Sequence, residues 1–456
     1  MRRKKNKLGS ILFMLSLIGG IALAVFVSFS PMFERQAPQI SIVENGYWNL
    51  KTPLHVEMED ASGISSYHVN LIYNNEKVLL SNQKFDQAQP KVSIDIDAPK
   101  NVAAFNPESV QVEIIANDAS HWNLLAGNEA VQSVNLKVDT KMPQVNVIAN
   151  SMYLYKGGSG IVVFQGNDEN LEDLYIETNF GKRFKPQPFY KEGFYISLVA
   201  WKVTEPSFSA KIVAKDHAGN IRNTAVPFRL RDRKYQISKI KLNDTFLEGK
   251  IAELAETFEI TKQTTDRMEQ FKIINEEIRA KNEKLIHDIT SPVGKEMLQS
   301  VSFKPFYPLK NGKKVASFGD HRLYYRNGIK VSESYHLGLD LASVKMGDIH
   351  TQNSGEVVFA DFNGLYGNMP AIHHGLGLYT IYGHCSNIAV STGYSVKPGD
   401  LIANTGMSGY AMGDHLHFGV LVQGVEVRPE EWMDSKWLQV NIYDTIRDAK
   451  KIIDRQ

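Results

Sequence analysis

The chain has 456 residues, of which 43% are hydrophobic and 22% charged, so its composition predicts a folded chain of about three domains. Its formal net charge of +1 argues against a protein that mainly binds a polyanion such as nucleic acid, because that binding needs clustered Lys and Arg. The single cysteine, Cys385, excludes a disulfide within the chain, so packed cores or a metal must supply its stability.

The N-terminus begins with a basic cluster, MRRKKNK (residues 1–7), followed by an uncharged, largely apolar segment at 8–29. As a helix this segment would be about 31–33 Å long, enough to cross a bilayer. We predict a cytoplasmic tail at 1–7 and a transmembrane anchor at 8–29, because basic residues favour the cytoplasmic side. A cleaved signal peptide is the alternative, but the apolar run is long and no A-x-A-like cleavage site follows it. The prediction is a single-pass protein of the inner (cytoplasmic) membrane whose remaining chain is periplasmic or otherwise extracytoplasmic.

Two related segments follow the anchor. PQISIV from Pro38 is similar to PQVNVI from Pro143, and VEIIANDAS (112–120) is similar to AKIVAKDHAGN (210–220). Short alternating runs of Val, Ile, Tyr and Phe between turn residues are typical of antiparallel sandwiches. DHAGNIRNTAVPFRL (216–230) resembles the closing hairpin of bacterial immunoglobulin-like domains. We therefore predict two Ig-like β-sandwiches, at 38–140 and 141–232, which act as spacer or docking modules.

The period of the apolar residues becomes helical from about Asn243. The helical stripe comprises Leu247, Ile251, Leu254 and Phe258, then Met268, Phe271, Ile274, Ile278 and Leu285. Asn243 or Asp244 could cap the start, and Pro292 ends the segment. We predict a helical linker or regulatory segment at 243–292. Two interpretations stay open: a helix pair packed on its neighbours, or an arm that covers an active-site groove or receives a partner protein.

The last part of the chain concentrates histidine, with eight of the thirteen histidines between His321 and His417. In SYHLGLDLA, His336 and Asp340 are four residues apart with Gly338 between them. On a strand all three would point to one face, and the glycine would leave space for a metal to approach. On a helix the two polar residues would also share a face, so the spacing suits a metal site in either case.

A second motif, GDHLHFGVLV, places His415 and His417 on one face of a predicted strand. A catalytic zinc site needs three nitrogen or oxygen ligands and one open position. The histidine and acid of the first motif, with one histidine of HLH, would supply that set. The other HLH histidine and His384, which ends LYTIYGHC and would share a strand face with Tyr382, would then be placed for proton transfer.

The segment 308–427 resembles the lysostaphin-type (LytM-like) peptidoglycan zinc metalloendopeptidase family. It carries, in that family's order, VASFGDHR, HLGLDLA, GEVVFA, YGNMPAIHHGLGLYTIYGHC, VKPGDLIANTGMSG and GDHLHFGV. The resemblance implies zinc ligands at His336, Asp340 and His417 and catalytic histidines at His384 and His415. It implies a zinc metalloendopeptidase domain at 301–435, and we predict a C-terminal helix at 436–456. The sequence departs from the family pattern at Pro370, which predicts an interrupted or edge strand, and at Cys385.

The fold class predicted is multidomain and mainly β: an N-terminal transmembrane helix, two β-sandwich domains, a helical segment and a C-terminal antiparallel β-sheet peptidase domain. The predicted function is a membrane-anchored, Zn²⁺-dependent endopeptidase that hydrolyses peptide stems or cross-links of peptidoglycan in cell-wall remodelling. Its predicted partners are peptidoglycan, the cytoplasmic membrane, and a regulatory protein docking on the helical or Ig-like segments, with no nucleic acid. The alternative is a non-hydrolytic peptidoglycan-binding or activator protein that uses the same domain. Sequence leaves open which histidine is the base, and whether the bond is D-Ala to diaminopimelate or lies in a Gly-rich bridge.

Overall fold

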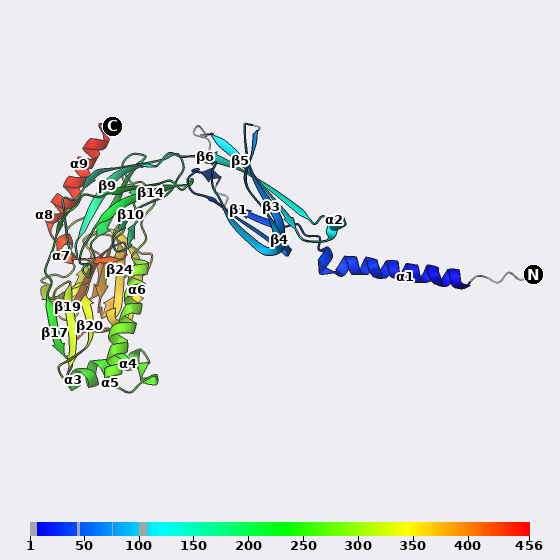
Figure 1. Cartoon of the computed structure of the whole chain (residues 1–456). Helices are drawn as coiled ribbons and strands as arrows, with labels where there is room; N and C mark the ends of the chain where they lie inside the picture. Colours follow the sequence, from blue (N-terminus) through cyan, green and yellow to red (C-terminus); the bar gives the residue numbers. More distant parts are fainter. Residues whose placement is uncertain (1–6, 43–45, 75, 100–106) are drawn as a thin grey trace, which may run out of the picture. The chain divides into compact units, whose positions relative to one another are not determined.

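The structure is a computed structural model that describes residues 7–42, 46–74, 76–99 and 107–456. It divides into two compact units, the first comprising residues 1–142, 170–172 and 215–221 and the second the rest of the chain. The described chain is mainly β, with an apolar N-terminal helix, a helical segment and a C-terminal β domain (Figure 1). The predicted fold class is confirmed at this level.

The N-terminal helix α1 (Lys7–Phe29) is followed by a 3₁₀ turn, η1 (Pro31–Phe33). Its stretch Gly9–Phe29 has a mean hydropathy of 2.5 and is long and apolar enough to cross a membrane. The predicted cytoplasmic tail lies outside the described residues, apart from Lys7, where α1 begins.

The first unit contains one six-stranded sheet in the order β1-β3-β5-β6-β2, with β4 paired to β3. Up to Glu59, β3 pairs with β1 and β4. From Ile64 onward it pairs with β5 and β4, and its register against β4 shifts between Glu59 and Ile64. The ladder therefore continues through the irregularity, and the strands form one sheet instead of the two separate sheets expected for 38–140. The elements are β1 (Gln39–Ile42), β2 (Tyr47–Trp48), β3 (Leu54–Tyr73), β4 (Glu76–Ile96), β5 (Ser109–Asp118), α2 (Trp122–Leu125) and β6 (Glu129–Val138).

The strands that follow form two four-stranded sheets, β11-β10-β14-β15 and β12-β13-β9-β7, and a short pair, β8 and β16. A side chain at Gly166 on β9 would lie 3.2 Å from Leu174 on β10, so the two sheets approach closely there. The strands are β7 (Gln144–Asn150), β8 (Tyr153–Tyr155), β9 (Ser159–Asn167), β10 (Leu171–Thr178), β11 (Arg183–Phe184), β12 (Gln187–Pro188), β13 (Phe194–Ala200), β14 (Ala210–Asp216), β15 (Ile221–Ala225) and β16 (Arg229–Arg231).

The repeated sequence VEIIAND/AKIVAKD has the same local structure in both copies. Asp118 ends β5 and accepts hydrogen bonds from the backbone N and Nδ2 of Asn128, at 2.8 and 2.7 Å. Asp216 ends β14 and accepts the same pair from Asn220, at 2.7 and 2.8 Å. Both carboxylates are buried, so in each copy an asparagine supplies the partners that a buried carboxylate needs.

The helical segment comprises α3 (Asp244–Phe246), a π-helical turn η2 (Leu247–Ile251), α4 (Ala252–Thr257), η3 (Ile260–Lys262), α5 (Arg267–Lys272), a second π-helical turn η4 (Ile273–Ile278) and α6 (Arg279–Ile289). Asn243 caps α3, because its side chain accepts a hydrogen bond from the backbone N of Phe246 at 2.8 Å. The predicted stripe is buried or partly buried up to Ile278, but Leu285 is exposed and Ile286 is buried instead. The turn η4 adds a residue to the helical repeat and so shifts the buried face by one position.

The stripe packs on the peptidase domain. Its buried residues form one core with Tyr324 and Leu365 of that domain. Further along, His287 Nε2 on α6 lies 2.8 Å from Glu426 Oε1. This is the packed helix pair of the first interpretation.

The C-terminal domain contains three sheets. The main sheet has the order β18-β21-β29-β25-β24-β23-β27 with β30 on β29. The two smaller sheets are β17-β19-β20 and β22-β28-β26, and their strands alternate along the chain with those of the main sheet. Pro370 lies on β24, which is central, and pairs with Ala360 where β24 is bonded only to β23. Because β24 is not paired with β25 at this residue, the missing N–H of the proline removes no hydrogen bond from that strand pair. The expectation of an interrupted or edge strand is wrong.

The strands of this domain are β17 (Ile237–Lys241), β18 (Lys313–Ala316), β19 (Asp320–Arg326), β20 (Ile329–His336), β21 (Leu339–Ala342), β22 (Asp348–His350), β23 (Gly355–Phe362), β24 (Asn368–His373), β25 (Leu378–Gly383), β26 (Asn387–Ile388), β27 (Ser395–Val396), β28 (Leu401–Asn404), β29 (Leu416–Val422) and β30 (Val425–Val427). Its helical elements are η5 (Gly364–Tyr366), α7 (Pro429–Trp432), α8 (Ser435–Leu438), η6 (Gln439–Tyr443) and α9 (Asp444–Ile453).

Glu431 on α7 is a buried carboxyl group that joins this domain to β9. Its Oε2 accepts a hydrogen bond from the backbone N of Ser159 at 3.2 Å, and a side chain at Gly158 would overlap it. Burial raises the pKa of Glu431 from 4.5 to about 7, although the hydrogen bond from Ser159 lowers it. The folded protein therefore retains a proton that the unfolded chain releases at lower pH.

We expect Glu431→Gln to change how stability depends on pH. Between pH 4.5 and about 7 the folded state binds more protons than the unfolded state, so the wild type loses about 3 kcal/mol of stability as the pH rises through this window. The variant has no carboxyl group to ionise at this position, so it does not lose this stability. It should therefore be more stable than the wild type at pH 8, but not at pH 4.5. Urea unfolding of the full-length protein in detergent, followed by tryptophan fluorescence, measures the difference. Glu430→Gln, at the partly exposed neighbour, is the control, and equal pH dependence in wild type and Glu431→Gln would contradict the assignment.

Candidate active site

Three strands of the C-terminal domain bring His336, Asp340 and His417 together. His336 ends β20, and Asp340 lies on β21, directly opposite His417 on β29. The expectation of one strand carrying His336, Gly338 and Asp340 is wrong, because the chain leaves β20 after His336 and re-enters a different sheet at Leu339. The four-residue spacing therefore spans a crossing between two sheets.

The three side chains converge on one point through named atoms. His336 Nε2 lies 3.0 Å from Asp340 Oδ1 and 3.1 Å from His417 Nδ1, and the last two atoms are 2.9 Å apart. His336 Nδ1 lies 2.9 Å from the carbonyl oxygen of Ser317. If Nδ1 donates its hydrogen to that carbonyl, the neutral ring presents the lone pair of Nε2 to the other two atoms. Acceptor atoms that face one another at these distances need a proton or a metal cation between them.

The donor set and the burial of this group fit a metal ion. All three residues are at most 8% exposed, and two imidazoles with one carboxylate are ligands that zinc takes at catalytic sites. His417 Nε2 is buried, and among the described residues it has no hydrogen-bond partner. A Cβ at Gly338 would lie 2.4 Å from this nitrogen. Only glycine therefore lets the ring of His417 sit where its Nδ1 reaches the group.

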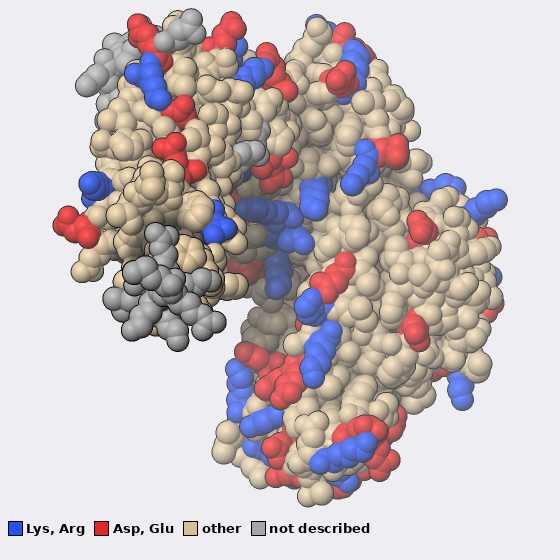
Figure 2. All heavy atoms as spheres, turned by 90° about the vertical axis from the view of Figure 1, so that its right-hand side faces the viewer, with Lys and Arg blue, Asp and Glu red and all other residues tan. Residues whose placement is uncertain are grey.

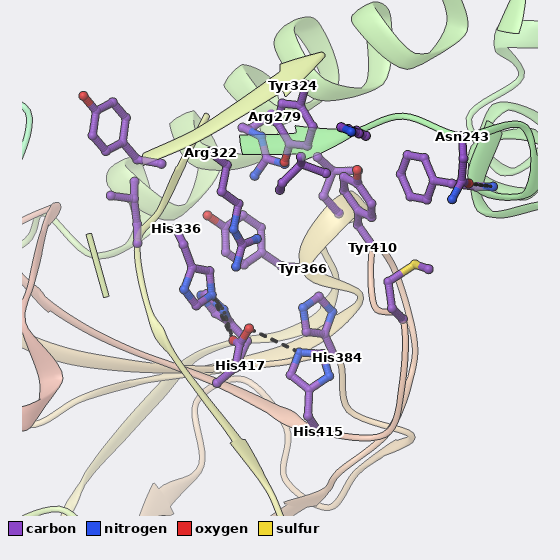
Figure 3. A pocket seen from close by; sticks show the side chains of 18 residues that line it. Asn243, Arg279, Arg322, Tyr324, His336, Tyr366, His384, Tyr410, His415 and His417 are labelled. Atoms are coloured by element: carbon purple, nitrogen blue, oxygen red, sulfur yellow. Dashed lines mark hydrogen bonds and ion pairs between the residues drawn. The ribbon is translucent and has the colours of Figure 1, made fainter. Parts of the chain in front are cut away.

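Two further histidines lie beside this group and point toward it (Figure 3). The rings of His384 and His415 are 4.8 Å apart between centroids, and His384 is 5.8 Å from His417. His384 Nδ1 lies 2.9 Å from the carbonyl oxygen of Ser408, and His415 Nδ1 lies 2.7 Å from that of Gly413. Both rings can therefore be held by a backbone carbonyl while the other nitrogen, Nε2, remains available for a proton.

His415 and His417 differ in their relation to Asp340. His417 Nδ1 is 2.9 Å from Oδ1, whereas His415 Nε2 is 3.7 Å from the other oxygen, Oδ2. His417 is thus one of the three converging residues, whereas His415 lies beside the group, next to Asp340.

His384 does not share a strand face with Tyr382, as the alternation predicted. The strand β25 ends at Gly383, and His384 has a left-handed backbone with φ of 64°. Its backbone N donates a hydrogen bond to the carbonyl oxygen of Tyr366 at 2.7 Å. The chain therefore turns out of the sheet at this residue, while the ring of Tyr382 packs on Phe418.

Burial controls the charges of the site. It lowers the pKa of His384 to about 3, helped by the charges of His417 and His415, so this imidazole is neutral at physiological pH. Burial alone would raise the pKa of Asp340, but hydrogen bonds from His336 and His417 outweigh it and hold that pKa well below its usual range. The neighbouring Cys385 is buried and its thiol pKa is raised to about 12. It is a packed residue, not a reactive thiolate.

The five residues line a pocket of about 440 Å³. The strands β17 and β19, the helical segment and the loop between β28 and β29 contribute much of the remaining wall. Their side chains include six that sequence reasoning did not select for the site: Asn243, Phe246, Arg279, Arg322, Tyr324 and Tyr410. One signal was present in the sequence. Asn275 and Arg279 are four residues apart on a helix, next to the apolar stripe, and a polar pair there is unusual unless it has buried partners.

The comparisons with known proteins agree with this geometry. Residues 334–429 match the model of peptidase family M23. The C-terminal part of the chain is therefore a domain of this LytM-type peptidase family, as the sequence motifs predicted.

Relatives with different functions share this domain. The DD-carboxypeptidase/endopeptidase Mpg of Neisseria meningitidis serogroup B is 32% identical over 94 residues, which are 21% of this chain and 22% of that protein. The peptidoglycan DD-endopeptidase ShyA of Vibrio cholerae serotype O1 is 31% identical over 118 residues, 26% and 27% of the two chains. The murein hydrolase activator EnvC of Escherichia coli K12 is 35% identical over 79 residues, 17% and 19% of the two. The chain thus spans between 19% and 27% of the length of these relatives.

Proposed function

We propose that this protein is a membrane-anchored zinc endopeptidase that hydrolyses peptide stems or cross-links of peptidoglycan outside the cytoplasm. The observation that carries the proposal is the convergence of His336, Asp340 and His417 within 2.9–3.1 Å of one another, with His384 and His415 beside them in one pocket. The family match and the peptidoglycan endopeptidase among its relatives support the substrate class.

In this proposal His336 Nε2, Asp340 Oδ1 and His417 Nδ1 hold zinc. Zinc supplies a Lewis acid that polarises the scissile carbonyl and makes water acidic enough to attack it. His384 and His415 orient the attacking water, accept its proton at Nε2 and return a proton to the leaving amine. Two imidazoles can divide these roles, because each is held at Nδ1 by a backbone carbonyl.

A non-hydrolytic binding or activator protein is the second candidate, since one relative is named a murein hydrolase activator. Residues of all five predicted positions are present in this chain and lie together, which favours the enzyme. The test is release of soluble fragments from purified sacculi by the full-length protein. An enzyme loses this activity on chelation and regains it with zinc, whereas an activator releases nothing from sacculi in either state.

The other assignments belong to the same proposal. We propose that residues 8–29 anchor the chain, that 38–140, which forms one sheet, and the Ig-like sandwich at 141–232 are spacer or docking modules, and that 301–435 form the peptidase domain. The segment 243–292 has a second role beside packing, because Asn243, Phe246 and Arg279 line the pocket. It is then part of the substrate-binding wall, and a regulatory protein that moves it would change activity.

The anchor orientation gives a separate expected result. A reporter enzyme fused after Gln456 that works only outside the cytoplasm should be active, because the basic residues at 1–7 favour a cytoplasmic N-terminus. Fusions of a periplasmic and a cytoplasmic reporter at this position, compared in intact cells, measure it. Activity of the cytoplasmic reporter alone would contradict both the orientation and a wall substrate.

A further inference from the structure

The charged side chains that line the pocket, apart from its histidines, are mostly cationic. Lys241, Arg279 and Arg322 line it, and Asp340 is the one acidic residue among the described residues of the lining. Asp340 is directed at His336 and His417. On the surface near the helices α3–α5, at the lower end of Figure 2, basic and acidic side chains are mixed instead. The pocket thus has a local positive charge that favours an anionic ligand.

Arg322 lies close to the converging group. On β19 and β20, Asp320 is directly opposite His336 and Arg322 is directly opposite Ser334. Arg322 is therefore the diagonal neighbour of His336 on the same face, a Cα separation of about 7–8 Å that a long side chain can bridge. Figure 3 shows its guanidinium extending into the pocket toward Tyr366 and the histidines.

A hydrogen bond to Asp320 fixes the orientation of the Arg322 guanidinium. Its Nε donates to Asp320 Oδ2 at 3.4 Å, and that carboxylate also accepts a hydrogen bond from Ser238 Oγ at 2.8 Å to Oδ1. Asp320 is 6% exposed. Among the described residues, this is the one hydrogen bond that the side chain of Arg322 makes, so its two terminal nitrogens remain available to a ligand in the pocket.

Arg279 is held on the helical wall of the pocket. Its Nε donates to the carbonyl oxygen of Asn275 at 3.2 Å and its Nη2 to Asn275 Oδ1 at 3.1 Å. Asn275 is 1% exposed and donates in turn to Ser332 Oγ on β20 at 2.9 Å. The guanidinium lies 5.9 Å from the ring centroid of Tyr410 and 4.0 Å from Glu283 Oε1. Two positioned guanidiniums therefore line one pocket beside the candidate metal group.

We propose that Arg322, supported by Arg279, binds a carboxylate of the peptide whose bond is cleaved. The inference rests on the proposed function and specifies its substrate. A guanidinium presents paired N–H groups that match a carboxylate. A cross-link through a diaminodicarboxylic acid carries a carboxylate on the carbon next to the scissile amide nitrogen, whereas a Gly-rich bridge has no carboxylate there. The pocket is thus built for the first class of cross-link, and Arg322 is a specificity-determining residue.

The test compares two synthetic cross-linked peptides that differ only in this group: the free carboxylate and its amide. Zinc-loaded full-length protein in detergent should bind and cleave the free acid better, by a factor on the order of 10–100 in kcat/KM and in affinity. Arg322→Gln should bring both ratios close to one. Arg322→Lys, which keeps the charge but loses the paired N–H groups, should give intermediate ratios.

Arg447→Gln is the matched control, because Arg447 is an exposed arginine on α9 that pairs with Asp444 and Asp448. It should keep the wild-type ratios, and zinc content and melting temperature show that each variant is folded. Equal binding of the two peptides by the wild type, or unchanged ratios in Arg322→Gln, would overturn the carboxylate assignment. A binding preference that depends on Arg322, without cleavage of either peptide, would support it while contradicting the proposed endopeptidase.

Discussion

Alanine in place of His336, Asp340 or His417 is expected to remove both bound zinc and peptidoglycan hydrolysis. Each residue supplies one of three atoms that lie 2.9–3.1 Å apart, and a catalytic zinc site retains only three protein ligands. Losing one leaves a two-ligand site without the Lewis acid that the reaction needs. Zinc per chain, measured on purified full-length protein by atomic emission, together with release of fragments from sacculi, checks this result.

His350→Ala is a suitable control for these variants. His350 lies on β22, and its Nδ1 lies 3.0 Å from the carbonyl oxygen of Gly399, outside the pocket lining. It should keep its zinc and its activity. A variant of His336, Asp340 or His417 that still holds one zinc per chain would remove that residue from the ligand set.

His415→Ala is expected to keep zinc and lose turnover by a factor on the order of 10²–10⁴, the usual effect of removing a general acid or base. Its Nε2 is 3.7 Å from Asp340 Oδ2, and its Nδ1 is held by Gly413, so it lies beside the ligand group without contributing to the converging atoms. His417→Ala, two residues along the chain, should lose zinc as well. The pair therefore separates proton transfer from metal binding.

Metal analysis of this pair is more informative than activity, because both variants are expected to be nearly inactive. Equal loss of zinc in both would make His415 a ligand and leave His384 alone for proton transfer. Full activity in His415→Ala would make that histidine structural.

The predicted site residues come together in the structure, but their strand assignments were less accurate. The apolar run in HLHFGVLV correctly indicated a strand, but every residue of β29 is buried, so the expected division into a packed face and a free face is wrong. The four-residue spacing of His336 and Asp340 gave no sign that the chain changes sheets between them. Their meeting with His417 depends on the register of β21 against β29, which is a long-range property.

The second wall of the pocket could not be predicted. Arg279 comes from a helix and Arg322 from β19, and they share a pocket only because the helical stripe packs on Tyr324 and Leu365. The turn η4 also shifted the buried face from Leu285 to Ile286. A regular helical period cannot anticipate an inserted residue. Likewise, the left-handed backbone of His384 reflects its hydrogen bond to Tyr366, not its local sequence.

The most direct test of the account is to count new amino termini in purified sacculi treated with the full-length, zinc-loaded protein in detergent. A zinc endopeptidase that cuts peptide stems or cross-links should expose new amino groups in proportion to time and enzyme. That signal should disappear in His415→Ala while its zinc remains. No increase in amino termini from protein that holds one zinc per chain would contradict the enzyme and favour a binding or activator protein.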